Sequence, residues 1–186
     1  ADLLYIPYIV FPIKNERQTG LLFPRVSSRI GEGFSYEQPW YWAIDKSQDL
    51  TLSPIFWSKR GIGSQLQYRY AYNNLSWLEY NGWFINDYIY QPGEFNEAQS
   101  GHKFFRFQNN FDIHYQPSLN TNSHFWGIDH KDLDFIKDFP RFANDKITGT
   151  EIGINGFVNH RTSKFDFSIE AHQWKNLLSS EPYQFS

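Results

Sequence analysis

The sequence contains no cysteine and no methionine among its 186 residues. Without cysteine, neither a disulfide framework nor a thiolate metal site can form within it. There is also no run of about 18 apolar residues, the length that a membrane-spanning helix needs, and no signal peptide opens the chain. Because no segment has a helical period of apolar residues, we predict an all-β chain. The missing initiator methionine suggests a mature or excised piece of a larger protein.

The chain also lacks a large excess of either charge, because it has 17 basic and 20 acidic residues. This balance gives no electrostatic footprint for nucleic acid, so we expect no nucleic-acid partner. Aromatic residues, in contrast, make up 20% of the chain on a polar background. This composition is typical of two classes of protein. One is a transmembrane β-barrel with aromatic girdles, and the other is a soluble β-sandwich that binds carbohydrate on exposed rings.

Two prolines mark the first predicted strands. Residues 20–44 read as two β-strands joined by a polar, glycine-containing connection around Arg29–Gly33, with Pro24 in the middle of the first strand and Pro39 in the middle of the second. Proline has no N–H to give to a strand ladder, so we predict weak pairing here. Alternatively, Pro24 only protects an edge strand from aggregation. That alternative accounts for one proline better than for two.

The rest of the chain alternates apolar and polar residues with a period of two. In the clearest strand, Lys103–Tyr115, phenylalanines at 105, 107 and 111 share one face, while Arg106 and Asp112 lie on the other. With the opening pair, about nine strands are predicted, forming an antiparallel up-and-down meander. The seven later strands are expected at residues 50–57, 65–72, 75–85, 103–115, 123–130, 150–159 and 164–174.

The predicted connections alternate in length. Those at residues 46–49, 73–74, 116–122 and 161–163 are short, whereas residues 87–102 and 131–149 form long ones. In a meander, alternate connections lie at opposite ends of the strands, so all long loops fall at one end. Outer-membrane barrels are built in this way. The pattern therefore favours a partial transmembrane barrel wall over the sandwich, and a small closed barrel acting as a pore is a third possibility.

No catalytic motif is present, so we expect neither an enzyme nor a cofactor. The densest ligand-like cluster lies at a strand end running into an acidic loop, where such side chains are usually solvated, and we expect no metal there. Its members are His124, Asp129, His130 and Asp132. Glu37, Glu79 and Glu170 are formal candidates for a glycosidase pair, but on the barrel interpretation they face a hydrated lumen. The lumen-facing candidates are Glu37, Arg69, Glu79, Arg106, Asp112 and Glu170.

One predicted loop has an amphiphilic sequence. Residues 132–142, DLDFIKDFPRF, combine acidic side chains with three phenylalanines. On the barrel interpretation this loop could pack over the mouth of the lumen.

Several stretches resemble the LPS-assembly protein LptD family, also called the organic solvent tolerance protein. They are PYIVFPIKNERQTGLLFP (residues 7–24), YEQPWYWAI (36–44), LTLSPIFWSKRG (50–61) and QYRY (67–70). Their order and spacing are similar to the start of that family's barrel. The resemblance is specific over about the first 70 residues and rests on strand pattern and loop placement further on.

The resemblance implies a large outer-membrane barrel that passes lipopolysaccharide into the outer leaflet. It implies that Pro24 and Pro39 weaken a lateral gate, and that residues 1–19 lead in from a periplasmic domain ahead of residues 20–186. Implied partners are lipopolysaccharide, outer-membrane lipids, the remaining strands and periplasmic domain of the same protein, an LptE-type plug lipoprotein and an LptA-type periplasmic bridge. Nine strands cannot close around so large a substrate, so the chain is expected to be an N-terminal part of the barrel.

Overall fold

The described structure consists almost entirely of β-strands. It is a computed structural model that describes residues 17–89, 104–130, 135, 138, 139, 151–176, 184 and 185. Within these residues there is no helix long and apolar enough to cross a membrane. The strands are β1 (Gly20–Leu21), β2 (Arg25–Arg29), β3 (Gly33–Glu37), β4 (Trp40–Asp45), β5 (Gln48–Trp57), β6 (Gly61–Asn73), β7 (Ser76–Asp87), β8 (Phe104–Ser118), β9 (Thr121–His130), β10 (Glu151–Arg161), β11 (Asp166–Asn176) and β12 (Gln184–Phe185).

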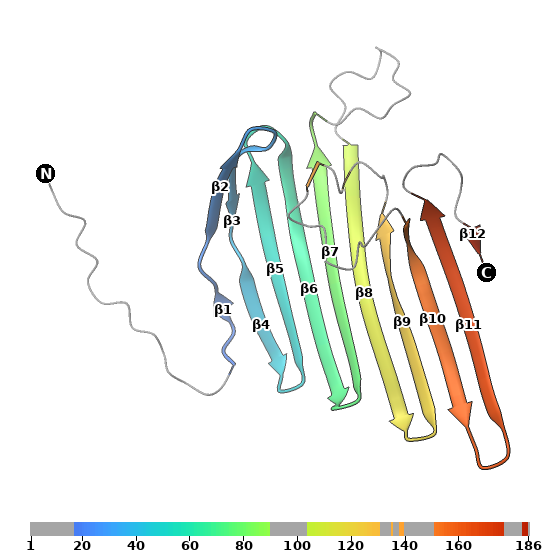
Figure 1. Cartoon of the computed structure of the whole chain (residues 1–186). Helices are drawn as coiled ribbons and strands as arrows, with labels where there is room; N and C mark the ends of the chain where they lie inside the picture. The colour runs from blue at the N-terminus through green and yellow to red at the C-terminus, as the bar shows by residue number, and fades with distance from the viewer. Residues whose placement is uncertain are drawn as a thin grey trace, which may run out of the picture.

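All twelve strands belong to one antiparallel sheet whose order follows the chain from β4 to β12 (Figure 1). Strand β1 pairs with β4, while β2 pairs with β3 and β3 with β5. The predicted meander is therefore confirmed, and each of the nine predicted segments occurs as a strand. The first two predicted strands differ in being divided, one into β1 and β2 and the other into β3 and β4. Strand β12 was not predicted.

The described strands form an open sheet. Strands β1 and β12 are the two ends of its order and do not pair with each other. The part of the chain that the structure describes contains no second sheet packed against the first. It therefore has the architecture of a wall segment and not that of the β-sandwich or of the small closed barrel that were the alternatives.

Four tight turns lie at one end of the sheet. Residues 46–47, 74–75, 119–120 and 162–165 connect β4 to β5, β6 to β7, β8 to β9 and β10 to β11 at the lower end in Figure 1. The longer connections join β7 to β8 and β9 to β10 at the opposite end, which also carries the three-residue connections 30–32 and 58–60. We call the two ends the turn end and the loop end. The prediction that both long connections lie at the same end is thus confirmed.

The strand register gives the sheet two chemically different faces, because residues opposite each other in neighbouring strands point to the same side. One row across the sheet, which defines the polar face, is Asp49, Arg69, Glu79, Asp112, Trp126, Asn155 and His172. The adjacent row, which defines the apolar face, is Leu50, Tyr68, Tyr80, Phe111, Gly127, Ile154 and Gln173.

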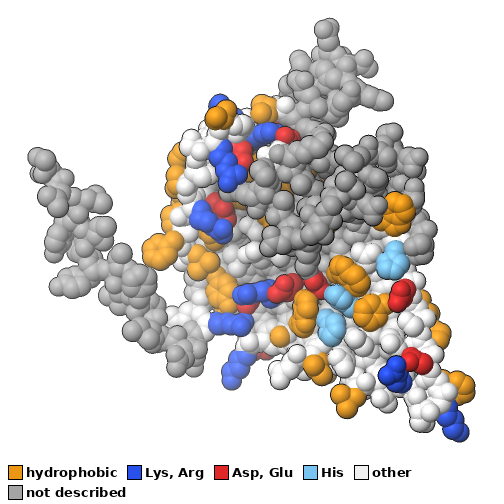
Figure 2. All heavy atoms as spheres, in the orientation of Figure 1, with side chains coloured by type: hydrophobic (Ala, Val, Ile, Leu, Met, Phe, Trp, Pro, Cys, Tyr) orange, Lys and Arg blue, Asp and Glu red, His pale blue; other side chains and the backbone are white. Residues whose placement is uncertain are grey.

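Burial of the two faces is inverted relative to a water-soluble sheet. On the polar face Arg106 is 1% and Gln108 0% exposed, whereas on the apolar face Phe105 is 46% and Phe167 54% exposed. Figure 2 shows charged and histidine side chains spread over one face, with hydrophobic side chains both among them and along its margins. A contiguous exposed apolar surface of this kind needs a non-aqueous environment or a partner.

Close packing at the loop end depends on one glycine. A Cβ added at Gly63 would lie 2.2 Å from the carbonyl oxygen of Phe84 and 2.8 Å from a ring carbon of Trp57. Only a residue without a side chain therefore fits beneath the Trp57 indole.

We predict that Gly63→Val lowers the stability of the full-length protein by about 1–3 kcal/mol, because Trp57 and the neighbouring backbone must shift. The matched control is Gly31→Ala, since a Cβ at Gly31 meets no atom within 4 Å. The temperature at which the folded protein loses its compact migration on a gel measures both variants. Equal temperatures for the two variants would contradict this packing.

Candidate functional site

The pairing of the first strands is interrupted where the prolines stand. Leu21 lies opposite Trp40 in the β1–β4 pair, and Arg25 lies opposite Glu37 in the β2–β3 pair. Three residues of the first strand, 22–24, therefore face only two of the second, 38–39. This is a one-residue β-bulge, which locally disrupts the ladder. The predicted weak pairing thus occurs where the first predicted strand is interrupted between β1 and β2 and the second between β3 and β4. We call this interruption the gap.

The two prolines have different surroundings. Pro24 is exposed, whereas Pro39 is among the fully buried side chains, below 2% exposure. Substituting Pro24 therefore changes mainly the backbone, while substituting Pro39 also removes packed atoms.

A third proline, which sequence analysis missed, lies beside this gap. The register of β3 and β4 with β5 is continuous, with Glu37 opposite Ile55 and Trp40 opposite Leu52. Gln38 therefore faces Pro54, and its N–H donates to the Pro54 carbonyl oxygen at 3.1 Å. Pro54 has no N–H to return, so this pair makes one hydrogen bond instead of two. The signal was a proline inside the predicted strand 50–57.

The side chain of Gln38 bridges the gap. Its Nε2 donates to the Leu22 carbonyl oxygen at 2.8 Å, and its Oε1 accepts a hydrogen bond from the Tyr36 hydroxyl at 2.9 Å. The Leu22 N–H donates to the Pro39 carbonyl oxygen at 2.9 Å. A side-chain amide thus supplies a link between the first two strands where prolines limit the backbone ladder. Sequence analysis gave Gln38 no role.

We predict that Gln38→Leu loosens β1 and β2, with hydrogen exchange of the Leu22 amide rising about fivefold for the loss of roughly 1 kcal/mol. Tyr36→Phe keeps the amide donor and is expected to have a smaller effect. Mass spectrometry of the peptide spanning residues 21–26, in the full-length protein, measures this. Unchanged exchange in Gln38→Leu would show that the amide does not hold the strands together.

All six lumen-facing candidates lie on the polar face by register, and several are ion-paired. Arg25 contacts Glu37 at 3.0 Å, and the Asp112 carboxylate contacts His124 Nε2 at 2.8 Å. The His124 ring stacks on Trp126 with their centroids 4.2 Å apart. Charged and polar side chains on this face therefore pair with one another across neighbouring strands. The candidates that it carries are Glu37, Arg69, Glu79, Arg106, Asp112 and Glu170.

The sheet does not bring the three glutamates together as a catalytic pair. Glu37, Glu79 and Glu170 lie on β3, β7 and β11. Three strand spacings separate β3 from β7, about 14 Å along the sheet, and four separate β7 from β11. Glycosidase carboxyl groups lie within about 10 Å of each other.

The ligand-like cluster is also divided. His124 lies on the polar face opposite His114, whereas Asp129 lies opposite Asn109 on the apolar face. The side chain of His130 and the whole of Asp132 lie outside the described residues. Among the residues described, no group of three or more potential ligands could hold a metal ion.

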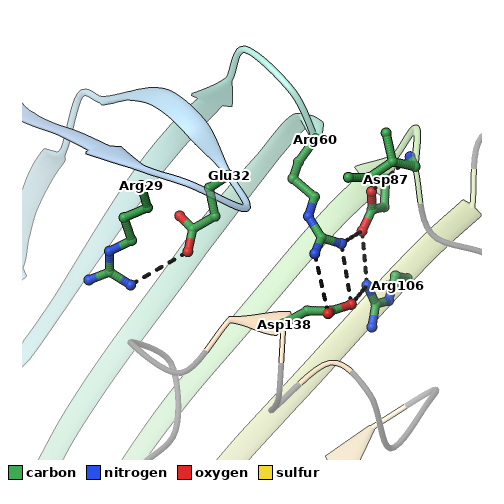
Figure 3. A network of polar contacts seen from close by, with 7 residues as sticks. Arg29, Glu32, Arg60, Asp87, Arg106 and Asp138 are labelled. Carbon is green, nitrogen blue, oxygen red and sulfur yellow. Dashed lines mark hydrogen bonds and ion pairs between the residues drawn. The ribbon is translucent and has the colours of Figure 1, made fainter.

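A four-residue ion cluster stands at the loop end of the polar face (Figure 3). Arg60 and Arg106 each donate to Asp87 Oδ2, at 2.8 and 2.9 Å, and each donates to Asp138 Oδ2, at 3.2 and 2.7 Å. The side chains of Arg106 and Asp87 are 1% and 0% exposed. Two positive and two negative charges therefore compensate each other in a buried position, which is what makes their burial tolerable.

Two phenylalanines of the amphiphilic segment cover the same region. Phe135 and Phe139 are 1% and 0% exposed. The Arg60 guanidinium lies over the Phe139 ring at 5.1 Å, and Arg106 lies over the Phe135 ring at 5.5 Å. The described residues of this segment thus pack on the polar face at the loop end, and a position over the mouth of a lumen stays a prediction. The apolar cluster that they complete comprises Ile55, Trp57, Trp83, Ile85, Phe135 and Phe139.

Asp138 joins this segment to the sheet as a carboxylate. Burial alone would raise the pKa of Asp138, but hydrogen bonds from Arg60 and Arg106 outweigh it and lower the pKa below its ordinary value of 3.8. For Arg60, burial acts to lower the pKa, and the hydrogen bonds with Asp138 and Asp87 raise it. The pKa of Asp138 is depressed in the folded state. The carboxylate therefore contributes its full stabilisation of the fold above about pH 4, and this stabilisation is lost as the pH falls through the lowered pKa.

We predict that Asp138→Asn increases hydrogen exchange of the peptide containing Phe139 at pH 5–8, because two charge-assisted hydrogen bonds are weakened. The difference from the unmodified protein is expected to shrink as the pH falls through the lowered pKa of Asp138, where Asp138 itself becomes protonated. The control is Asp166→Asn, which breaks an exposed pair with Arg161 that contributes about 1 kcal/mol or less. A difference independent of pH, or equal effects of the two variants, would contradict this assignment.

The open meander, its inverted faces and its alternating connections define a wall segment of a transmembrane β-barrel. The sequence model of the family described as "LptD protein" matches residues 2–128. The chain therefore belongs to the LptD family.

Curated relatives share the name "LPS-assembly protein LptD". That of Aeromonas hydrophila is 30% identical over 182 residues, covering 96% of this chain and 22% of that protein. That of Vibrio vulnificus is 25% identical over 186 residues, with 99% and 23% covered. That of Pseudoalteromonas atlantica is 43% identical over 74 residues, with 40% and 10% covered. The chain thus spans less than a quarter of the length of these relatives.

Proposed function

We propose that this chain forms part of the outer-membrane translocon that inserts lipopolysaccharide into the outer leaflet. It would contribute the first strands of a lateral gate and a hydrophilic part of the lumen wall. The observation that carries the proposal is the single open sheet with an exposed apolar face and a charged polar face. The name shared by the relatives supports the assignment of lipopolysaccharide as cargo.

The two faces suit the two halves of such a cargo. Sugars and phosphates would stay against the polar face inside the barrel, and acyl chains would leave sideways into lipid. The work is transport, and it needs no covalent chemistry. The buried cluster around Phe135 and Phe139 covers part of the polar face at the loop end. This covering favours a sideways exit of the cargo over its passage through the loop end.

The lateral gate would lie at the edge formed by β1 and β2. Pro24 and Pro39 remove backbone donors there, and each net hydrogen bond is worth roughly 1 kcal/mol. A few such omissions bring local opening within thermal reach. Pro54 extends the weakened region into β5. The Gln38 bridge would keep β1 and β2 attached to the rest of the sheet while the gate is closed.

The edges of the sheet require further strands of the same protein. In lipid, unpaired strand edges leave backbone groups without partners at a cost of several kcal/mol each. The remaining barrel strands would cover β1, β2 and β12, and residues 1–19 would link this wall to a periplasmic domain. An LptE-type plug lipoprotein and an LptA-type periplasmic bridge are the partners proposed for the complete protein, with lipopolysaccharide and outer-membrane lipids as the molecules it contacts.

We predict that Pro24→Ala combined with Pro39→Ala slows lipopolysaccharide delivery or raises detergent sensitivity of cells, because restored N–H donors make the gate harder to open. Pro117→Ala is the matched control, since Pro117 lies in β8, far along the sheet from this edge. Appearance of new lipopolysaccharide at the cell surface and growth in detergent measure the effect, with folded protein quantified in each strain.

Pro24→Ala alone separates gating from packing, because Pro24 is exposed and Pro39 is not. If folded protein with both substitutions delivered lipopolysaccharide at the normal rate and kept the barrier intact, the gate assignment would be wrong.

A further inference from the structure

Two adjoining hollows lie on the polar face at the turn end. One has a volume of about 200 Å³ and the other about 290 Å³, and both are lined by Arg69 and Glu79. Figure 2 shows basic and acidic side chains next to each other on this face of the molecule. We call the combined surface the turn-end trough. Its polar lining includes Arg17, Lys46, Gln67, Arg69, Glu79 and Asn81.

One buried carboxylate holds two arginines at the trough. Arg69 donates through Nε to Asp49 Oδ1 at 2.8 Å and through Nη2 to Oδ2 at 3.0 Å, while Arg17 Nη1 donates to Oδ2 at 2.8 Å. The Asp49 side chain is 4% exposed, but those of Arg17 and Arg69 are 54% and 59% exposed. Asp49 therefore fixes the guanidinium groups while leaving them accessible, a prerequisite for a preorganised anion site.

The charges of the trough do not cancel. Arg17, Lys46 and Arg69 carry three positive charges, against two negative charges on Asp49 and Glu79, so one positive charge remains. The Lys46 ammonium has no ion-pair partner among the described residues. An added anion of one unit would complete the balance.

Uncharged polar groups continue the trough toward the middle of the sheet. Gln67 and Asn81 face each other across β6 and β7, and Asn81 Oδ1 is buried without a hydrogen-bond partner in the described part of the chain. Amide groups of this kind both donate to and accept from hydroxyl groups. An acceptor without a partner carries a free-energy penalty that a ligand hydroxyl would relieve.

We propose that the turn-end trough binds the anionic sugar head group of the transported glycolipid. Its phosphate or carboxylate would lie against Arg69, Arg17 and Lys46, and its hydroxyl groups would hydrogen-bond to Gln67 and Asn81. The trough lies at the end of the sheet with the tight turns, which in outer-membrane barrels is the periplasmic end. It would therefore be an early contact of the head group on entering the lumen. This inference rests on the proposed transport function.

The test uses a photoreactive amino acid introduced into the full-length protein in cells. Position 67 lies in the trough, and position 68 is the next residue of β6 on the apolar face, so the pair forms a matched control. Position 155 serves as a reference, because Asn155 lies on the polar face in β10, three strands beyond β7 and away from the trough. After irradiation, adducts are detected with an antibody against lipopolysaccharide. We expect adducts at positions 67 and 155 and few at position 68.

Removing the cations then tests the trough itself. With Lys46→Gln and Arg69→Gln, the adduct at position 67 is expected to fall about tenfold, as for the loss of charge-assisted hydrogen bonds, while the adduct at position 155 changes little. Lys46→Gln alone should give a smaller decrease and leaves the Arg69–Asp49 pair intact. The control is Arg161→Gln, a cation of the polar face at the turn of β10 and β11.

The failure of this inference is distinguishable from the failure of the proposed function. Adducts at position 155 but none at position 67, or adducts at position 67 that the Lys46 and Arg69 variants do not reduce, would overturn the trough and leave the translocon standing. No adduct at either polar-face position, with folded protein present, would overturn both.

Discussion

The ladder of backbone hydrogen bonds is the constraint on which this structure depends. A sheet exposed to lipid must satisfy every N–H and C=O group through its neighbours, because no water is available to replace a lost partner. The long pairs between β5 and β11 meet this requirement over ten or more residues in most cases. The ladder is weakest at Pro24, Pro39 and Pro54, and there the Gln38 amide takes over part of its task. A gate placed at this edge would use a weakly paired region next to the long, continuous pairs of β5 to β8.

The same ladder determines which side chains lie on the polar face and which lie on the apolar face. Once register is set, each residue is committed to one side, so Arg106 is buried among charges while its neighbour Phe105 is exposed. The polar face also differs between its loop end and its turn end. At the loop end, two arginines and two aspartates hold Phe135 and Phe139 over the sheet. At the turn end, Asp49 presents arginines to an open hollow. One end is thus closed by packing and the other is accessible.

The sequence predicted the features that depend on local period and missed those that depend on register. Alternation within residues 103–115 was sufficient to assign Phe105 and Arg106 to opposite faces, and loop lengths were sufficient to order the ends. The division of the first two strands could not be seen, because the one-residue offset between Leu21 and Arg25 exists only relative to Trp40 and Glu37. For the same reason Gln38, Asp49 and Asp87 had no assigned role. Their contacts with Leu22, Arg69 and Arg60 join residues that are 16, 20 and 27 positions apart in sequence.

The central claim is that the polar face meets water and the apolar face meets lipid in the assembled membrane protein. Single cysteines placed at consecutive positions 167–172 of β11, where the side chains of both faces are exposed or half-buried, test it directly with a water-soluble maleimide in the full-length protein within intact outer membranes. The protein without an added cysteine gives the background. The account predicts labelling at even positions and protection at odd ones. Equal labelling at both, or labelling of the odd positions alone, would contradict it.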